Sequence, residues 1–183
     1  MRKIVLNLAV TLDGFIEGPN GEIDWCALDG ESDAFFDKFL PEVDSIFYGR
    51  VSYDLWGQYQ PPDTASASEK KLWSIVHSKE KYVFSRKPSP DSNVTYIADN
   101  IVERVMEIKQ QPGKNIWLYG GAKLISYFVN ENLVDNYLLA VFPVLLGSGK
   151  PLFQNITGRL TLRLNSIEHS SSGVLLLNYE AKR

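Results

Sequence analysis

The fold is indicated by one stretch of the chain, Ile116-Trp117-Leu118-Tyr119-Gly120-Gly121-Ala122-Lys123-Leu124. Four large apolar residues predict a buried strand, and a helical pattern with Leu124 and Phe128 four residues apart follows the two glycines. A strand that passes through paired glycines into a helix leaves backbone N–H groups at the positive end of the helix dipole. Lys123 in the first helical turn is easier to explain if an anion lies there. The stretch therefore predicts either an anion site or a tight turn that needs glycine for backbone reasons alone.

The composition indicates an ordinary globular protein. The chain has 183 residues, of which 44% are hydrophobic and 22% are charged, and we expect a single domain over residues 1–183. The net charge is −3 with both signs interspersed, so we expect neither a nucleic-acid partner nor a membrane partner. No apolar run approaches the ~18 residues of a membrane helix.

The cysteine content indicates the compartment and excludes one kind of metal site. Cys26 is the single cysteine, so no internal disulfide can form and a cytoplasmic location is expected. The basic start of the chain runs into an apolar strand without a cleavage-type site, which argues against a signal peptide. Cys26, His77 and His169 cannot form a Cys-rich zinc site, and we expect no bound metal.

Predicted strands and helices alternate over most of the chain. Apolar runs predict strands at residues 3–10, 43–48, 81–84, 94–97, 116–119 and 134–142. Helical patterns cover residues 33–40, with Ser32 as the cap, and residues 54–56, 69–76 and 101–110. Residues 160–164 and 174–179 alternate around a turn at 170–173 and predict a closing antiparallel hairpin. The pattern predicts an α/β fold with a mostly parallel sheet.

Three of the predicted strands end in similar chemistry. Small residues, donors and cations occur together in Gly49-Arg50-Val51-Ser52, Ser85-Arg86-Lys87 and Gly120-Gly121-Ala122-Lys123. In a parallel sheet these ends meet at one edge, where ligands bind. Several phosphates on one ligand explain the coincidence better than a single anion does, and Arg86 with Lys87 suits the extra 2′-phosphate of a dinucleotide. The G-x-G-x-x-G motif of an ordinary Rossmann domain is absent.

The loop after the first predicted strand, residues 11–21, is rich in glycine and carries several apolar side chains. Leu12, Phe15 and the nearby Trp25 either dock on the core or form a pocket wall beside a planar ligand. We favour the pocket wall because the loop follows the first strand directly.

Residues 11–16, 48–50, 117–122 and 142–153 together resemble the dihydrofolate reductase-like superfamily. They resemble most the reductase domain at the carboxyl end of bifunctional riboflavin-synthesis deaminase–reductases and its stand-alone bacterial relatives. The resemblance implies a three-layer α/β fold, in which helices flank a central, mostly parallel mixed sheet that ends in an antiparallel hairpin. It also implies NADPH as the hydride donor.

The resemblance assigns roles residue by residue. It implies a cofactor-binding set of Leu12, Gly49, Arg50, Ser52, Ser85, Arg86, Tyr119, Gly120, Gly121, Ala122 and Lys123. It implies Asp13 and Asp33 as catalytic candidates, and Phe15, Trp25 and Asp54 as substrate contacts. Dihydrofolate reductases usually have a third glycine where this chain has Ala122, and the segment before Asp33 does not align cleanly.

The expected function is NADPH-dependent reduction of a small pyrimidine or pterin, most similar to 5-amino-6-(5-phosphoribosylamino)uracil reductase. One alternative is a dihydrofolate reductase-like activity in which Asp33 pairs with the pterin. A second alternative is an NADPH-binding module without turnover. The chain has neither the length nor the cysteines for the zinc deaminase half. The apolar C-terminal hairpin predicts a homodimer.

Overall fold

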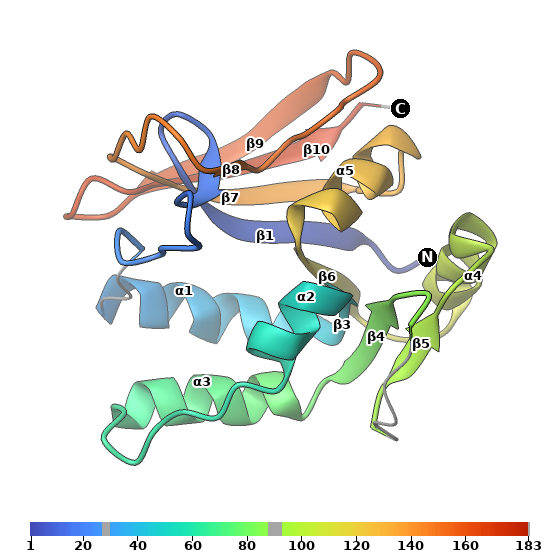
Figure 1. The fold of residues 1–183 in the computed structure, drawn as a ribbon, viewed down its shortest axis with the longest axis horizontal. Helices are drawn as coiled ribbons and strands as arrows, with labels where there is room; N and C mark the ends of the chain where they lie inside the picture. The colour runs from blue at the N-terminus through green and yellow to red at the C-terminus, as the bar shows by residue number, and fades with distance from the viewer. Residues whose placement is uncertain (27–29, 88–92, 183) are drawn as a thin grey trace. The chain divides into compact units, whose positions relative to one another are not determined.

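The computed structural model describes residues 1–26, 30–87 and 93–182, and it describes the backbone but not the side chains of residues 30–33. The chain forms two compact units (Figure 1). The first unit comprises Met1–Arg2 and Asp29–Gly121, and the second comprises Lys3–Leu28 and Ala122–Arg183. Each unit is described by itself.

The first unit is built on parallel strands. They lie in the order β5-β4-β3-β6, with β3 at Val43–Gly49, β4 at Glu80–Phe84, β5 at Thr95–Ile97 and β6 at Asn115–Gly120. Ile46, Phe47 and Tyr48 of β3 are fully buried. Parallel strands are covered on both faces, which explains why they are continuous apolar runs in the sequence.

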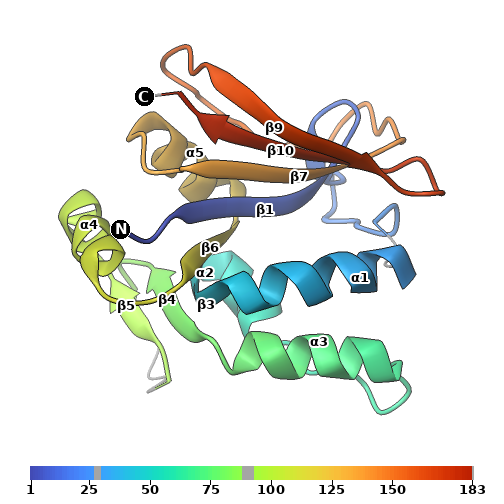
Figure 2. The same cartoon turned by 180° about the vertical axis from the view of Figure 1, so that it is seen from behind.

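The helices of the first unit pack through aromatic residues. They are α1 (Gly30–Phe39), η1 (Leu40–Glu42), α2 (Arg50–Ser52), the π-helical η2 (Tyr53–Gly57), α3 (Ala67–His77) and α4 (Ile101–Gln110). The Phe39 ring of α1 meets the Trp117 ring of β6 edge-on, with centroids 5.2 Å apart. Helices α1 and α3 lie side by side (Figures 1 and 2), and Lys71 Nζ is 2.7 Å from Asp37 Oδ1.

A charged network holds the beginnings of β3 and β6 together. The buried Arg2 donates from Nε to Lys114 O at 2.7 Å, and from its Nη2 to Ser45 Oγ at 2.6 Å and to the Asp44 carboxylate. Asp44 also accepts the Lys114 N–H at 2.7 Å. Burial raises the pKa of Asp44, but the Lys114 and Ser45 hydrogen bonds and the Arg2 charge outweigh it, so this pKa is lowered.

The second unit is a mixed arrangement. Its strands lie in the order β1-β7-β10-β9, with β1 at Ile4–Thr11, β7 at Asn136–Phe142, β9 at Leu162–His169 and β10 at Leu175–Ala181. Strands β1 and β7 are parallel, whereas β10 pairs with both β7 and β9 in antiparallel register. Helix α5 (Ala122–Asn130) buries Ile125 and Phe128.

The antiparallel hairpin has an irregular register. Ser166 lies opposite Asn178, but Leu164 lies opposite Tyr179, so Asn165 is an extra residue in β9. Because of this β-bulge, Leu164 and Ile167 face the same side although they are three residues apart. Both side chains are about half exposed, at 50% and 57%. The hairpin therefore presents an apolar face.

Two short strands were not predicted. Strand β2 (Phe15–Glu17) pairs with β8 (Lys150–Pro151) and adds structure to the loop predicted at residues 11–21. The predicted α/β class, the mostly parallel pairing and the closing antiparallel hairpin are all confirmed.

Within residues 1–26, 30–87 and 93–182, no helix is long and apolar enough to cross a membrane.

Candidate cofactor and substrate site

In the first unit, the three strand ends predicted to converge do lie at one edge. Gly49 of β3 lies opposite Phe84 of β4, and Tyr48 lies opposite Gly120 of β6. The segments that follow are linked as well, because Arg50 Nη1 donates to Lys87 O at 2.7 Å.

Arg50 begins α2 directly after β3 and is held in place by an acidic neighbour. Its Nε lies 2.8 Å and 2.7 Å from the two carboxylate oxygens of Asp54, and this hydrogen bond raises the pKa of Arg50. Asp54 was expected to contact substrate. Its pairing orients Arg50, and its contact with substrate stays a prediction. Ser52 is the last residue of α2 and is partly exposed.

The segment after β4 forms a tight turn. The Ser85 N–H donates to Ile97 O at 3.0 Å, and Ser85 Oγ accepts the Lys87 N–H at 3.0 Å. The Arg86 and Lys87 side chains are exposed. The Ser85 hydroxyl also donates to Lys87 O at 3.1 Å, so the turn presents chiefly two cations at the strand end, which suits a phosphate.

The glycine pair after β6 leaves open backbone. Gly120 has φ 122°, which favours glycine, and the peptide bond to Gly121 is cis. A Cβ at Gly121 would meet no atom within 4 Å. Tyr119 is half-buried, and the centroid of its ring lies 4.9 Å from that of the Tyr48 ring. A ligand can therefore approach the Gly121 backbone closely.

Two buried phenol groups next to this edge were not foreseen. The hydroxyls of Tyr48 and Tyr96 have no hydrogen-bond partner within the described ranges. Burial raises the pKa of Tyr48 well above its ordinary value. Buried polar groups are nearly always paired, so these hydroxyls are candidates to bond a ligand. The sequence pattern around each tyrosine predicts only an apolar strand and gives no sign of a ligand contact.

In the second unit, Asp13 holds a loop. Its Oδ2 accepts the N–H groups of Leu146 and Gly147 at 3.0 Å and 2.7 Å, and its Oδ1 accepts the Thr11 hydroxyl at 2.6 Å. The Thr11 hydrogen bond contributes most to lowering the pKa of Asp13, and the two backbone N–H groups add to it. At neutral pH this carboxylate is ionised and accepts hydrogen bonds on both of its oxygens. Its catalytic role stays a prediction.

The loop held by Asp13 carries an exposed leucine. Leu145 is 70% exposed and Leu12 is 63% exposed, and the Leu12 N–H donates to Val144 O at 3.0 Å. Two exposed leucines on adjoining segments form an apolar surface. Leu145 was not among the predicted site residues, although the apolar stretch before Gly147 could have indicated it.

The predicted aromatic contacts are packed within their own unit. Phe15 and Trp25 are half-buried, and Trp25 meets Phe142 edge-on at 5.4 Å. The Trp25 indole N–H is buried without a partner in the described part of the chain. A substrate contact therefore stays a prediction for both residues.

The remaining predicted residues lie in helices. Ala122 begins α5 and is buried, and Lys123 follows it and is exposed. Alanine here continues the helix better than a third glycine would. Helix α1 begins at Gly30, so Ser32 lies inside it and the prediction that Ser32 caps this helix is wrong. Asp33 also lies in α1, and its side chain is outside the described residues, so its catalytic role stays a prediction.

Relatives of the chain are found by sequence. Residues 2–176 match the family described as the RibD C-terminal domain. The curated Bacillus subtilis (strain 168) protein "Uncharacterized protein YyaP" is 52% identical over 179 residues, which cover 97% of this chain and 94% of that protein.

Solved structures show the same fold. A candidate riboflavin biosynthesis protein from Shewanella sp. PV-4 matches with a TM-score of 0.80 and 24% identity over 100% of both chains. A deaminase/5-amino-6-(5-phosphoribosylamino)uracil reductase from Thermotoga maritima matches with a TM-score of 0.70 and 16% identity, over 99% of this chain and 57% of that one. Dihydrofolate reductase from Enterococcus faecalis, complexed with NADP(H), matches with a TM-score of 0.63 and 11% identity, over 99% of this chain and 97% of that one. The expected dihydrofolate reductase-like fold is confirmed.

Proposed function

The chain belongs to the RibD C-terminal domain family, and from this premise we propose that it is an NADPH-dependent reductase of a small pyrimidine. The proposed reaction resembles that of 5-amino-6-(5-phosphoribosylamino)uracil reductase in riboflavin biosynthesis. One observation carries the proposal. The ends of β3, β4 and β6 lie at one edge and present a cation, a hydroxyl turn and open glycine backbone.

The residues at this edge fit the chemistry of a phosphorylated dinucleotide. We assign the 2′-phosphate to Ser85 and Arg86, because a hydroxyl and a guanidinium together donate charge-assisted hydrogen bonds. We assign the pyrophosphate to the Gly120–Gly121 backbone with Lys123, and a neighbouring contact to Gly49, Arg50 and Ser52. The hydroxyls of Tyr48 and Tyr96, which have no partner among the described residues, support an additional polar ligand at this edge.

The second unit supplies the proposed substrate surface. NADPH, when bound, supplies the hydride. Leu12 and Leu145 offer an apolar surface that excludes water from a planar ring. Asp13 holds the loop that carries Leu145, and we propose that it acts by positioning this loop, because its carboxylate is ionised at neutral pH.

Replacement of Arg86 tests the cofactor assignment. Arg86→Ala should weaken NADPH binding about tenfold or more, because a charge-assisted hydrogen bond contributes roughly 1.5 kcal/mol or more. NADH binding should change little, since NADH lacks the 2′-phosphate. Cofactor fluorescence measures both affinities. Arg104→Ala, which removes an exposed arginine from α4, is the control. Equal losses for NADPH and NADH would contradict the assignment of Arg86.

Turnover separates the proposed reaction from its alternatives. Loss of NADPH absorbance with 5-amino-6-(5-phosphoribosylamino)uracil supports the proposal, whereas loss with dihydrofolate alone supports the dihydrofolate reductase-like alternative. Binding without oxidation of NADPH by either substrate would support a binding module. Failure to bind NADPH at micromolar concentration would overturn both the assignment of NADPH as the cofactor and the proposed reductase activity.

Location, domain organisation and assembly complete the proposal. We propose a cytoplasmic protein, because the half-buried Cys26 has no second cysteine with which to pair. Recovery in the membrane or secreted fraction of its host would contradict this. We further propose that residues 1–183 form one domain and that two chains form a homodimer through the apolar face of β9 and β10.

A further inference from the structure

Arg50 joins two segments of the first unit through one guanidinium group. Its Nε lies 2.8 Å and 2.7 Å from the two carboxylate oxygens of Asp54, four residues further along the helical segment. Its Nη1 donates to Lys87 O, in the turn after β4, at 2.7 Å. Because a guanidinium is planar and rigid, these contacts fix the Lys87 carbonyl relative to the helical segment that carries Asp54.

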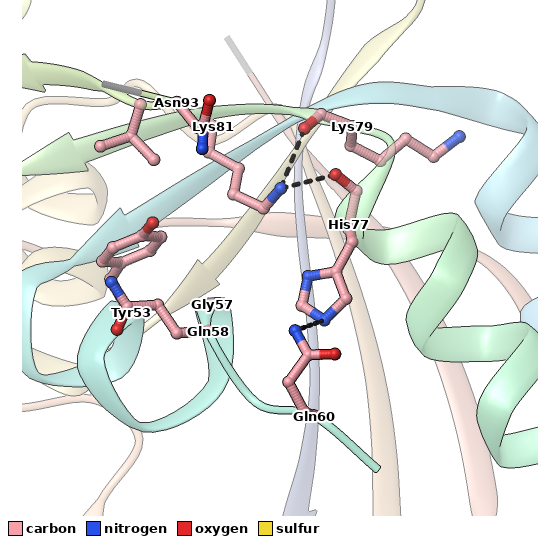
Figure 3. A pocket seen from close by; sticks show the side chains of 9 residues that line it. Tyr53, Gly57, Gln58, Gln60, His77, Lys79, Lys81 and Asn93 are labelled. Carbon is pink, nitrogen blue, oxygen red and sulfur yellow. Dashed lines mark hydrogen bonds between the residues drawn. The ribbon is translucent and has the colours of Figure 1, made fainter. Parts of the chain in front are cut away.

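The segment that carries Asp54 is itself closely packed. Tyr53, the first residue of η2, is 2% exposed, and its ring meets the Tyr48 ring of β3 edge-on, with centroids 5.7 Å apart. A Cβ at Gly57 would lie 2.1 Å from the Tyr53 ring, so the end of η2 lies directly against this ring. Tyr53 and Gly57 also line the polar hollow in Figure 3. Asp54 therefore offers Arg50 a carboxylate on a segment that β3 holds in place.

The turn after β4 is anchored at both of its ends. At its start, the Ser85 N–H donates to Ile97 O of β5 at 3.0 Å. At its end, Lys87 O accepts from Arg50 Nη1 and, at 3.1 Å, from the Ser85 hydroxyl, which belongs to the turn itself. Within the described ranges, the Arg50 contact is thus the hydrogen bond that ties the Lys87 end of the turn to another element.

This turn carries the two cations of the proposed cofactor site. Arg86 and Lys87 are both exposed, so the backbone of the turn decides where these side chains start and in which direction they leave it. Arg50 differs from them, because the Asp54 carboxylate beside it offsets its positive charge. Arg50 is therefore better suited to hold the turn than to supply the main charge that attracts a phosphate, although its remaining N–H groups can still contact the cofactor.

We propose that Asp54 and Arg50 are positioning residues, which hold the Ser85–Lys87 turn in the conformation that binds the 2′-phosphate of the cofactor. Given the proposed NADPH site, on which this role rests, the preference for NADPH over NADH depends on a carboxylate that does not touch the 2′-phosphate. The direction of the effect identifies the role. A carboxylate that acted only through its charge would repel the phosphate, so its removal would strengthen NADPH binding. Removal of a carboxylate that positions the turn should weaken NADPH binding instead.

Two replacements of Asp54 separate position from charge. Asp54→Asn and Asp54→Ala remove the same charge, but only asparagine keeps an oxygen that can accept from Arg50 Nε. Asp54→Ala should lower the ratio of NADPH affinity to NADH affinity about threefold, the size expected for an exposed charged pair, whereas Asp54→Asn should stay closer to wild type. Cofactor fluorescence measures both affinities. Glu107→Ala is the matched control, because it removes the acid of another exposed helical ion pair, with Arg104. An unchanged or increased ratio in Asp54→Ala would overturn the positioning role.

Hydrogen exchange tests the same contact without any cofactor. The Lys87 N–H donates to Ser85 Oγ at 3.0 Å, and this bond should open more often when the turn loses its anchor. Exchange at the Lys87 amide should be several-fold faster in Asp54→Ala and in Arg50→Lys, because an ammonium cannot bond both partners as a guanidinium does. Exchange as slow as in the wild type would contradict the positioning role even if NADPH binds. A wild-type protein that bound NADPH no better than NADH would overturn the proposed cofactor site, and the exchange rates would still show whether Arg50 holds the turn.

Discussion

Asp13 makes contacts that the sequence around it does not predict. Its position after the first predicted strand makes it a candidate site residue in the sequence. Its role depends on the N–H groups of Leu146 and Gly147, which lie 133 and 134 residues further along the chain. No local sequence pattern predicts a contact between residues so far apart in the chain. A carboxylate with three donors and a lowered pKa is suited to holding a loop.

Removal of the Asp13 carboxylate should loosen the loop. In Asp13→Ala, hydrogen exchange at the Leu146 and Gly147 amides should become several-fold faster, because both lose their acceptor. Mass spectrometry or NMR measures this directly. Asp37→Ala is the control, since its exposed carboxylate pairs with Lys71. Unchanged exchange at both amides would show that Asp13 does not hold the loop.

The same contact should depend on pH. The pKa of Asp13 is lowered in the folded protein, so its contribution is present above the ordinary aspartate pKa of about 3.9. The contribution is lost as the pH falls through the lower, folded value. Faster exchange at Leu146 and Gly147 should therefore begin only below about pH 4. A transition near neutral pH would instead assign a raised pKa to Asp13 and restore it as a proton donor.

Elements were predictable where their signal is local. The β3, β4 and β6 strands and the convergence of their ends followed from apolar runs and from the rules for parallel sheets. Helix α3 begins at Ala67, earlier than the predicted residue 69, because Ser66 Oγ accepts the Glu69 N–H at 3.1 Å. The Ser66-Ala67-Ser68-Glu69 sequence has the spacing of a capping box and could have indicated this start.

Elements were missed where the signal is distant or very short. Strands β2 and β8 have three and two residues, fewer than an alternating pattern needs, and they pair across more than a hundred positions. Strand β9 ends at His169, whereas the alternating pattern predicted a strand only as far as residue 164. The prediction stopped there because the bulge at Asn165 interrupts the alternation of apolar and polar residues. The polar network around Arg2 likewise joins residues that are too far apart in the sequence for a local pattern to indicate their contact.

The tight packing of Gly113 tests the importance of this network. A Cβ there would lie 2.7 Å from Asp44 Oδ2 and 3.1 Å from Arg2 Nε, and the φ of 153° already favours glycine. Gly113→Ala should therefore destabilise the protein by about 2 kcal/mol. Urea unfolding measures the change. Gly158→Ala, where a Cβ would meet nothing within 4 Å, should stay within about 0.5 kcal/mol. Equal effects would contradict the role of the Arg2 network.

These unfolding curves also test the proposal of a single domain. Tryptophan fluorescence reports mainly on the first unit, which contains Trp56, Trp73 and Trp117, whereas far-UV circular dichroism reports on the whole backbone. One domain should give coincident transitions by both probes, shifted together in Gly113→Ala. Separate transitions would show that the two units unfold independently.

At the scale of the molecule, the apolar face of the hairpin indicates assembly. Leu164, Ile167 and Leu175 are exposed on this face, and β9 is the last strand in the order of the second unit. Monomeric proteins rarely leave such a face and such an edge uncovered. A second copy of the chain can cover it, because a two-fold interface places the same patch on both sides.

A charge on this face should separate the two chains. In Ile167→Glu the unpaired carboxylate should weaken association by roughly 3 kcal/mol, about a hundredfold. Sedimentation velocity measures the mass, which for one chain is 20.7 kDa. Ser166→Glu places the same charge on the opposite face of β9 and should leave the dimer intact. A wild-type protein that sediments as a single chain at micromolar concentration would overturn the homodimer.

The extra residue in β9 makes this surface depend on chain length. Leu164 and Ile167 lie three residues apart and share a side because the pairing with β10 skips Asn165. Deletion of Asn165 would remove the bulge and leave the two residues two positions apart, so ordinary alternation would keep both on this side. During divergence, a codon lost here would therefore preserve the apolar face, whereas a codon gained that shifted the register by one would turn Leu162 and Leu164 to the other side without altering any side chain.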